Sequence, residues 1–444
     1  MRPRRALIVP ALALATVASS ATAATAASKD WTQYHGSRNR HGVAASMPHY
    51  SGRHLHVVKQ INLDGAVYAS PLVVHGITIA ATENNTVYAF NAHNHRVWKR
   101  HLGAPSPQSQ RPCGDIDPLG ITGTPIFHAS NNTIYVAAER SGTRPTHRLY
   151  ALSAGSGKVK WSRSLDRPGV DRAAMQERGA LAIADGRVWT PFGGLAGDCG
   201  QYKGRVVGFR LDGKGKPRTF TVPTAREAGI WTPPGPTVDG KGHLYVSVGN
   251  GASGPGDRYD HSDSVLKLNG KAKRIDSFSP STWATDNAAD LDLGSQGPAL
   301  VGKWVFIDGK SGTAYVLRRS HLGGIGGQVH KTSLCDSSFG GTAVEGSVVY
   351  VPCTDGVRAV RIGKKGRMQV KWHADSSITG SPVIGGGQVW TLDSGSGVLH
   401  ALGRVSGHDH GSVSVGSVNR FATPALSGRR ILVGTLAGLT VVKF

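Results

Sequence analysis

An acidic run stands out in the middle of a strongly basic chain. Asp286, Asp290 and Asp292 lie within WATDNAADLDLG, whereas the whole sequence has 51 Lys and Arg against 28 Asp and Glu, a formal charge of +23. Carboxylates this close together can cap turns or bind a structural cation. A carboxylate in a cleft can instead act as a general base. Of the three, Asp292 is our candidate for chemistry.

The four cysteines are compatible with three disulfide pairings. Cys335 and Cys353 flank a predicted hairpin, SSFGGTAVEGSVVYVPC, and are therefore placed to meet across it. Cys113 and Cys199 would then join two loops that are distant in sequence. The spacing matches no zinc module, because there is no CxxC and no pair of His near a Cys. Beside Cys113, Asp115 and Asp117 fit the ordering of a loop.

The first 26 residues have the pattern of a secretory signal peptide. Three arginines precede an apolar stretch from Ala6 to Val17, and small residues follow. Cleavage after Ala23 or Ala26 satisfies the small-x-small rule, and we predict Ala26. The mature chain, residues 27–444, is then expected to be one soluble domain in the extracellular space or cell envelope. No later stretch has the roughly 18 to 20 apolar residues of a spanning helix.

The charge surplus favours anionic partners such as acidic polysaccharide, cell-wall polymer or lipid headgroups. The Lys and Arg residues are scattered along the sequence, which is also typical of a basic solvated surface without one target. Nucleic acid is not an expected partner of an exported chain.

A repeat runs through the sequence. One unit starts at Tyr68 and another at Thr122, and both read small-Pro-apolar, turn, apolar strand, turn, Tyr-Ala-(Phe/Leu), polar turn and Trp. Weaker copies bring the number to eight. The equivalent positions are Pro71, Pro125, Leu181, Pro236, Pro298, Ala343, Pro382 and Pro424. The spacing between these positions is typical of four-stranded propeller blades, and the 60 Gly and 23 Pro of the sequence are typical of the turns between their strands.

The two ends of the chain predict ring closure. Residues 54–63, HLHVVKQINL, resemble an outermost fourth strand, and the final LAGLTVVKF resembles a third strand without a successor. The fold class we predict is all-β: an eight-bladed β-propeller of four-stranded antiparallel blades, closed by the N-terminal strand. Trp98, Trp161 and Trp372 are expected to fill space between blades.

The tract LYALSAGSGKVKW, residues 149–161, resembles the repeat of pyrroloquinoline quinone (PQQ) propellers. That family includes quinoprotein dehydrogenases and the non-catalytic propellers of outer-membrane assembly. The resemblance spans nearly the whole mature chain and implies the propeller fold. It does not decide the chemistry, because one fold hosts many functions.

The middle of the chain is similar in order to quinoprotein dehydrogenases. By that resemblance Trp231 would stack under PQQ, Asn250 would ligate calcium, Asp292 would be the catalytic base, and Lys310 would contact the quinone oxygens. Asp198 in GGLAGDCGQYKGRVVGF is the counterpart of the family's calcium-ligating Glu, with a shorter side chain and shifted spacing. The metal ligands implied are thus Asn250, Asp292 and Asp198.

Each of these residues has a structural alternative. Trp231 equally fits a filler between blades, Asn250 a left-handed turn before Gly, and Lys310 a solvated hairpin tip. Two functions therefore stay open. One is a PQQ- and calcium-dependent dehydrogenase of an alcohol or sugar, and the other is a non-catalytic propeller that binds an anionic envelope polymer or a protein.

Overall fold

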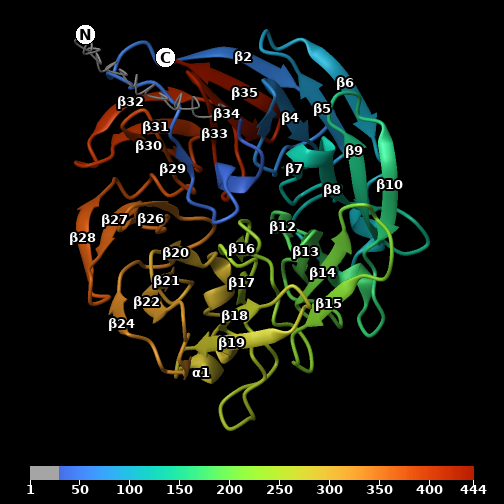
Figure 1. Ribbon diagram of the computed structural model, residues 1–444, viewed down its shortest axis with the longest axis vertical. Helices are drawn as coiled ribbons and strands as arrows, with labels where there is room; N and C mark the ends of the chain where they lie inside the picture. Colours follow the sequence, from blue (N-terminus) through green and yellow to red (C-terminus); the bar gives the residue numbers. More distant parts are fainter. Residues whose placement is uncertain (1–29) are drawn as a thin grey trace, which may run out of the picture.

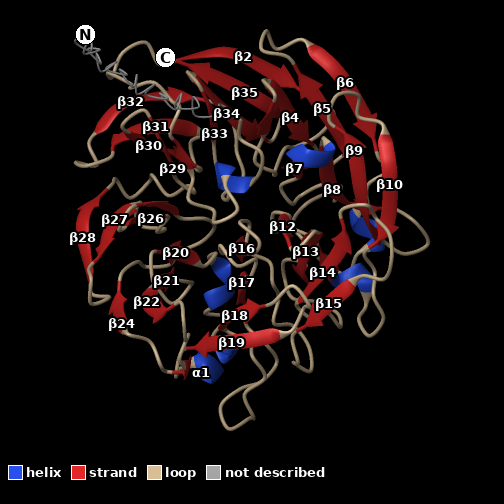
Figure 2. Cartoon of the chain, in the orientation of Figure 1, coloured by secondary structure: helices blue, strands red, loops and turns tan. Residues whose placement is uncertain are grey.

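Eight antiparallel sheets surround a central axis in the computed structural model, which describes residues 30–444 (Figures 1 and 2). The predicted signal peptide lies outside the described residues. In each blade the first strand is nearest the axis and the fourth forms the rim (Figure 1). The predicted fold class is confirmed.

The first four blades follow the sequence in order. Blade 1 contains β3 (Leu72–Val74), β4 (Ile77–Ala81), β5 (Thr86–Phe90) and β6 (Arg96–His101). Blade 2 contains β7 (Ile126–His128), β8 (Thr133–Arg140), β9 (Thr146–Ser153) and β10 (Val159–Ser164). Blade 3 contains β12 (Ala182–Ala184), β13 (Arg187–Gly194), β14 (Arg205–Arg210) and β15 (Arg218–Thr221). Blade 4 contains β16 (Thr237–Val238), β17 (Leu244–Val248), β18 (Ser264–Leu268) and β19 (Arg274–Ser279).

The other four blades repeat this arrangement. Blade 5 contains β20 (Ala299–Val301), β21 (Trp304–Ile307), β22 (Thr313–Arg318) and β24 (His330–Ser333). Blade 6 contains β25 (Ala343–Glu345), β26 (Val348–Val351), β27 (Arg358–Ile362) and β28 (Met368–His373). Blade 7 contains β29 (Val383–Gly385), β30 (Gln388–Asp393), β31 (Val398–Gly403) and β32 (Asp409–Ser414). Blade 8 contains β33 (Ala425–Ser427), β34 (Arg430–Thr435), β35 (Gly438–Lys443) and β2 (His56–Asn62).

The predicted repeat positions mark the start of every blade. Seven of the eight residues immediately precede a first strand, and Ala343 is itself the first residue of β25. Ring closure also follows the prediction, because β2 pairs antiparallel with β35 from His56 opposite Lys443 to Asn62 opposite Gly438.

Three sheets depart from the four-strand pattern because a neighbouring segment pairs with a free edge. The added strands are β1 (Val43–Ala44) in blade 7, β11 (Met175–Gln176) in blade 3 and β23 (Gly324–Ile325) in blade 4. Helix is minor in the described chain. It comprises α1 (Trp283–Ala288) and the 3-10 turns η1 (Tyr34–Gly36), η2 (Gln108–Gln110), η3 (Ala129–Asn131), η4 (Arg172–Ala174) and η5 (Leu293–Ser295).

Tryptophans on the fourth strands lock neighbouring blades together, as predicted. Trp98 and Trp372 each donate an indole N–H to a carbonyl of the next blade, Ala154 O at 3.0 Å and Arg404 O at 3.1 Å. Each ring also lies against a turn glycine with a positive φ. The pairs are Trp98 with Gly157, Trp161 with Gly213, and Trp372 with Gly407. A Cβ on these glycines would lie 2.5 to 2.7 Å from the ring, so only glycine fits the turn.

Residues 31–44 form a segment that we call the hub clasp, because it runs along the axis and bonds to every blade (Figure 1). It shares a hydrogen bond, as donor in some blades and as acceptor in others, with the first strand or with a residue one or two positions before it in each of the eight blades. The partners, in blade order, are Val73, Phe127, Leu181, Val238, Leu300, Val344, Ile384 and Thr423. Trp31, Tyr34, His35 and Arg40 of the clasp are all buried. The sequence repeat gives no sign of this segment, because it lies before the first unit.

The antiparallel meander gives the ring two different faces. Connections from first to second and from third to fourth strands lie at one end of every blade, the turn face. Connections from second to third strands, and from one blade to the next, lie at the other end, the loop face. Long connections occur mainly on the loop face, which is where ligands of such folds have room to bind.

Candidate functional site

A cavity of about 290 Å³ opens on the loop face at the axis, and we call it the hub cavity. This volume is at the lower end of the range for small-molecule sites. Its lining comes from connections that are far apart in sequence. The lining residues are Asp115, Gln176, Arg178, Gly194, Leu195, Ala196, Gly197, Asp198, Trp231, Asp290, Asp292, Lys310, Arg420 and Phe421.

Four of the five residues suggested by resemblance line this one cavity: Trp231, Asp292, Lys310 and Asp198. Asn250 lies directly beside it, because its backbone N–H donates to Asp292 Oδ1 at 2.5 Å. Asn250 is not in a left-handed conformation, so the simple-turn interpretation does not describe it. Trp231 is partly exposed in the cavity, unlike Trp98 and Trp372, which pack against the next blade.

Gly249, at the end of β17, brings the indole and the carboxylate together. A Cβ there would lie 2.2 Å from Asp292 Oδ1 and 3.0 Å from Trp231 Nε1. No side chain fits between them, so the absence of one at residue 249 allows Trp231 and Asp292 to approach the same point.

Lys310 bridges two carboxylates in the hub cavity. Its ammonium lies 2.6 Å from Asp292 Oδ2 and 2.7 Å from Asp290 Oδ1. The side chain of Asp292 is 4% exposed, whereas that of Asp290 is 64% exposed. Burial raises the pKa of Asp292 to about 6, and the charge of Lys310 keeps it from rising further. Asp292 is therefore ionised at neutral pH and titrates close to it.

The calcium ligands suggested by resemblance lie in or beside the cavity but are not assembled into a cage. The Asn250 amide nitrogen, oriented to donate, lies 2.6 Å from Asp292 Oδ1, and Asp198 accepts a hydrogen bond from the Tyr202 hydroxyl. Within residues 30–444, only Cys335, Cys353 and Asp355 place three His, Cys, Asp or Glu ligand atoms within 4.8 Å of one another, and these cysteines are disulfide-bonded. Calcium needs six to eight oxygens. The Lys310 ammonium already occupies the position of a cation beside Asp292. Calcium binding at this carboxylate therefore remains a prediction.

Two arginines and a phenylalanine complete the cavity, and sequence reasoning missed all three. The guanidinium carbons of Arg178 and Arg420 lie 4.4 and 4.6 Å from the centre of the Phe421 ring. Phe421 in turn meets the edge of Trp231, with ring centres 6.2 Å apart. Neither guanidinium has an ion pair within 4 Å in the described chain, so both positive charges are available to a ligand. No motif marks them, because they come from connections of different blades.

The remaining acidic candidates lie at different places in the structure. Asp286 lies on α1, where its carboxylate accepts from Thr282 Oγ1 at 2.6 Å, and it lines a different groove. Asp117 orders its loop by accepting from Gln108 N at 2.9 Å, whereas Asp115 lines the hub cavity. The loop interpretation of this pair therefore holds for Asp117 only.

Both expected disulfides, Cys113 with Cys199 and Cys335 with Cys353, are present. The first one joins the loop of Asp115 to the loop of Asp198, so it fixes one wall of the hub cavity.

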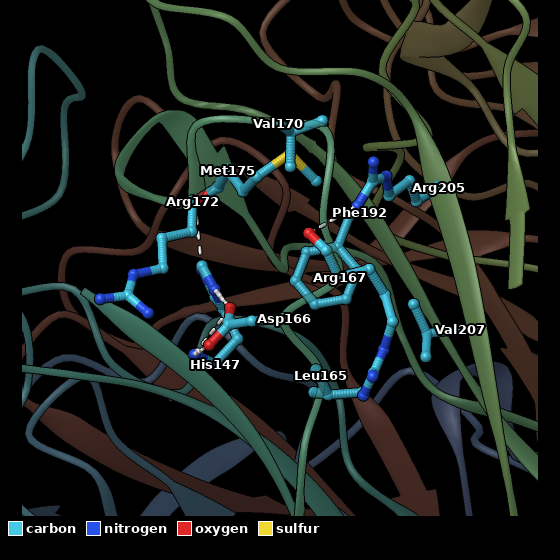
Figure 3. A pocket seen from close by; sticks show the side chains of 10 residues that line it. All are labelled: His147, Leu165, Asp166, Arg167, Val170, Arg172, Met175, Phe192, Arg205 and Val207. Carbon is cyan, nitrogen blue, oxygen red and sulfur yellow. Dashed lines mark hydrogen bonds and ion pairs between the residues drawn. The ribbon is translucent and has the colours of Figure 1, made fainter. Parts of the chain in front are cut away.

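A second pocket lies between blades 2 and 3, and Figure 3 shows its side chains. Its accessible volume is about 10 Å³, room for little more than one water molecule. His147 lies 2.8 Å from Asp166 and 3.3 Å from Glu139, and these carboxylates raise its pKa to about 10 despite its burial. This is a buried ion-pair network that joins strands, without space for a substrate.

The clasp closes the axis beneath the hub cavity. The space between Tyr34 of the clasp and Arg178 and Phe421 has an accessible volume of about 10 Å³. A ligand of the hub cavity therefore enters from the loop face.

Comparison with known proteins agrees with this architecture. A family model described as outer membrane protein assembly factor BamB matches residues 56–189. No curated protein matches the sequence. The quinohemoprotein alcohol dehydrogenase from Comamonas testosteroni is similar in structure, with a TM-score of 0.71, 14% identity, and coverage of 94% of this chain and 81% of that one.

Two further solved structures represent both branches of the resemblance. A europium-containing methanol dehydrogenase has a TM-score of 0.72 at 12% identity, over 94% of this chain and 98% of that one. BamB from Moraxella catarrhalis has a TM-score of 0.58 at 17% identity, over 88% of this chain and 98% of that one. Identities this low show a shared fold only. Taken with the repeats, the family-model match over residues 56–189 and the shared fold agree with the resemblance to PQQ-repeat β-propellers.

Proposed function

We propose that the hub cavity binds a planar anionic quinone of the PQQ type and that the protein is a dehydrogenase of an alcohol or sugar. One observation carries this proposal: Trp231, Asp292 and Lys310 line one cavity together with two arginines that lack ion pairs. PQQ is a flat ortho-quinone with three carboxylates. An indole face, an ammonium and two guanidinium groups match those three features.

The residues divide the chemical work as follows. Asp292 is ionised at neutral pH and would accept the substrate's hydroxyl proton at a carboxylate oxygen. Lys310 would stabilise negative charge that develops near its ammonium. Arg178 and Arg420 would hold carboxylates. The bound quinone would supply the electron acceptor for the hydride lost by the alcohol carbon.

We also propose that the protein acts outside the cytoplasm. The leader-like sequence of residues 1–26 and the two disulfides both support export. In the described chain no helix has the length and apolarity needed to cross a membrane.

Ligand titration tests the proposal directly. PQQ added to the mature protein, with and without calcium, should quench tryptophan fluorescence saturably, and PQQ trimethyl ester should bind much more weakly. Arg178→Gln should weaken binding, and Asp292→Asn should abolish turnover. Their matched controls, Arg144→Gln and Asp375→Asn, change exposed residues outside the hub cavity and should do neither. A dye-linked assay with alcohols and sugars then measures turnover.

A non-catalytic binding propeller is the second candidate, and the BamB family-model match over residues 56–189 favours it. Absence of saturable PQQ binding by the wild-type protein would decide for this candidate. Binding without turnover of any alcohol or sugar would leave a quinone-binding protein that is not a dehydrogenase.

A further inference from the structure

Charge is divided between the two faces of the propeller. The segments that make up the turn face carry thirteen Lys and Arg against three acidic residues. The segments of the loop face carry nineteen acidic residues against ten Lys and Arg. The basic residues are scattered in sequence but gathered in space, because each blade contributes its turns to the same end.

Lysines in the turns between third and fourth strands account for much of this charge. They are Lys158, Lys214, Lys216, Lys271, Lys273, Lys364 and Lys365. All seven are exposed, and in the described chain none of their ammonium groups has an ion pair or hydrogen bond. Their charges are therefore not neutralised within the protein.

Packing against the preceding blade fixes most of the turns that carry these charges. Gly157, Gly213 and Gly407 of three such turns pack on tryptophans of the preceding blade, and a Cβ on Gly366 of a fourth turn would lie 3.4 Å from Trp304 of the preceding blade. Val405 stands on one of these turns and is 82% exposed, the most exposed large apolar side chain in the described chain. A basic face with an exposed apolar side chain is suited to a membrane interface.

We propose that the turn face binds the surface of an anionic phospholipid membrane, with the hub cavity facing away from it. The turn lysines belong to blades 2, 3, 4 and 6 and follow the curve of the ring, so a straight polyanion could reach only some of them, whereas a charged plane reaches all. This inference does not depend on the function of the hub cavity. It needs only the division of charge and the docked turns.

Vesicle cosedimentation tests this binding. The mature protein should bind phosphatidylcholine vesicles that contain roughly one third phosphatidylglycerol, should release them in high salt, and should ignore pure phosphatidylcholine. The variant with Lys214, Lys216, Lys271, Lys273, Lys364 and Lys365 changed to Gln should bind about tenfold or more weakly.

The control variant loses the same charge elsewhere. It carries Lys59→Gln, Lys99→Gln, Arg144→Gln, Arg258→Gln, Lys331→Gln and Lys371→Gln, all exposed and all outside the turns of the turn face. It should retain most of the vesicle binding. Equal loss in both variants would overturn the proposal, since net charge alone would then explain binding. So would binding to soluble polyphosphate or heparin without binding to anionic vesicles. Thermal unfolding of each variant checks that the fold is intact.

Discussion

At the scale of residues, the central feature is one ammonium shared by two carboxylates of unequal burial. Asp290 is mostly solvated, so its contact with Lys310 contributes little. Asp292 is almost fully buried, and loss of its partner would leave an uncompensated charge. The pKa of Asp292 therefore depends on the ammonium of Lys310 beside it.

Removing that partner should change the titration of Asp292. In calcium-free buffer, wild-type Asp292 should lose its proton at pH about 6, and in Lys310→Met its pKa should rise above about 7 because burial is then unopposed. Carbon-13 NMR of the aspartate carboxyls, with Asp292→Asn to assign the signal, measures this value. Proton acceptance by Asp292 should be lost as the pH falls through the same range. An unchanged pKa in Lys310→Met would contradict the ion pair.

Sequence reasoning identified some of the residues that line the hub cavity. Trp231, Asp292, Lys310 and Asp198 could be placed because their segments resemble those of a known family in the same order. Arg178, Arg420 and Phe421 could not, because they meet by ring closure between connections far apart in sequence and follow no local pattern. Asp286 lies away from Asp292 because it is on α1, a short helix that the repeat pattern does not predict.

At the scale of elements, a tryptophan ring packed on a turn glycine joins neighbouring blades. Gly407 has φ +75° and a Cβ there would lie 2.7 Å from Trp372, so both conformation and space require glycine. This element was predictable in part. The Trp spacing indicated a filler between blades, whereas the glycine partner in the next blade required the structure.

The two requirements can be separated by a matched pair of variants. Gly76 also has φ +75°, but nothing lies within 4 Å of its Cβ position. Gly76→Ala should lower the free energy of unfolding by about 1–2 kcal/mol through conformation alone. Gly407→Ala should cost a further 1–3 kcal/mol or so, because the methyl group displaces the ring. Chemical denaturation of both measures the difference, and equal losses would mean that the ring contact contributes nothing.

At the scale of the whole molecule, the hub clasp joins blades that never touch one another. His35 is fully buried, with its ring nitrogens 3.0 Å from Thr342 O and from Thr423 Oγ1, so one side chain joins blades 6 and 8. Burial lowers its pKa to about 3, so the ring is neutral at physiological pH. The number of blades was predictable from repeat spacing, and the closing strand from the strand patterns near the two ends of the sequence. The clasp was not, because its partners are defined only once the ring exists.

Substitution of His35 tests how much the clasp stabilises the ring. His35→Leu should lower the free energy of unfolding by about 1–3 kcal/mol, because two buried polar groups lose their partner. His95→Leu, at an exposed turn position, should change it by no more than about 0.5 kcal/mol. Thermal or denaturant unfolding compares them. Equal free energies of unfolding for the two variants would show that His35 of the clasp does not stabilise the ring.

The pairing of β2 with β35 also constrains the order in which the protein can be assembled. The ribosome delivers residues 56–62 long before residues 438–443, so β2 has no partner strand until blade 8 has been synthesised. Until then β2 is an unpaired edge strand. Polar side chains protect such an edge from pairing with other chains, and β2 has four of them: His56, Lys59, Gln60 and Asn62. The ring of a nascent chain therefore cannot close before β35 has been made, however early the other seven blades form.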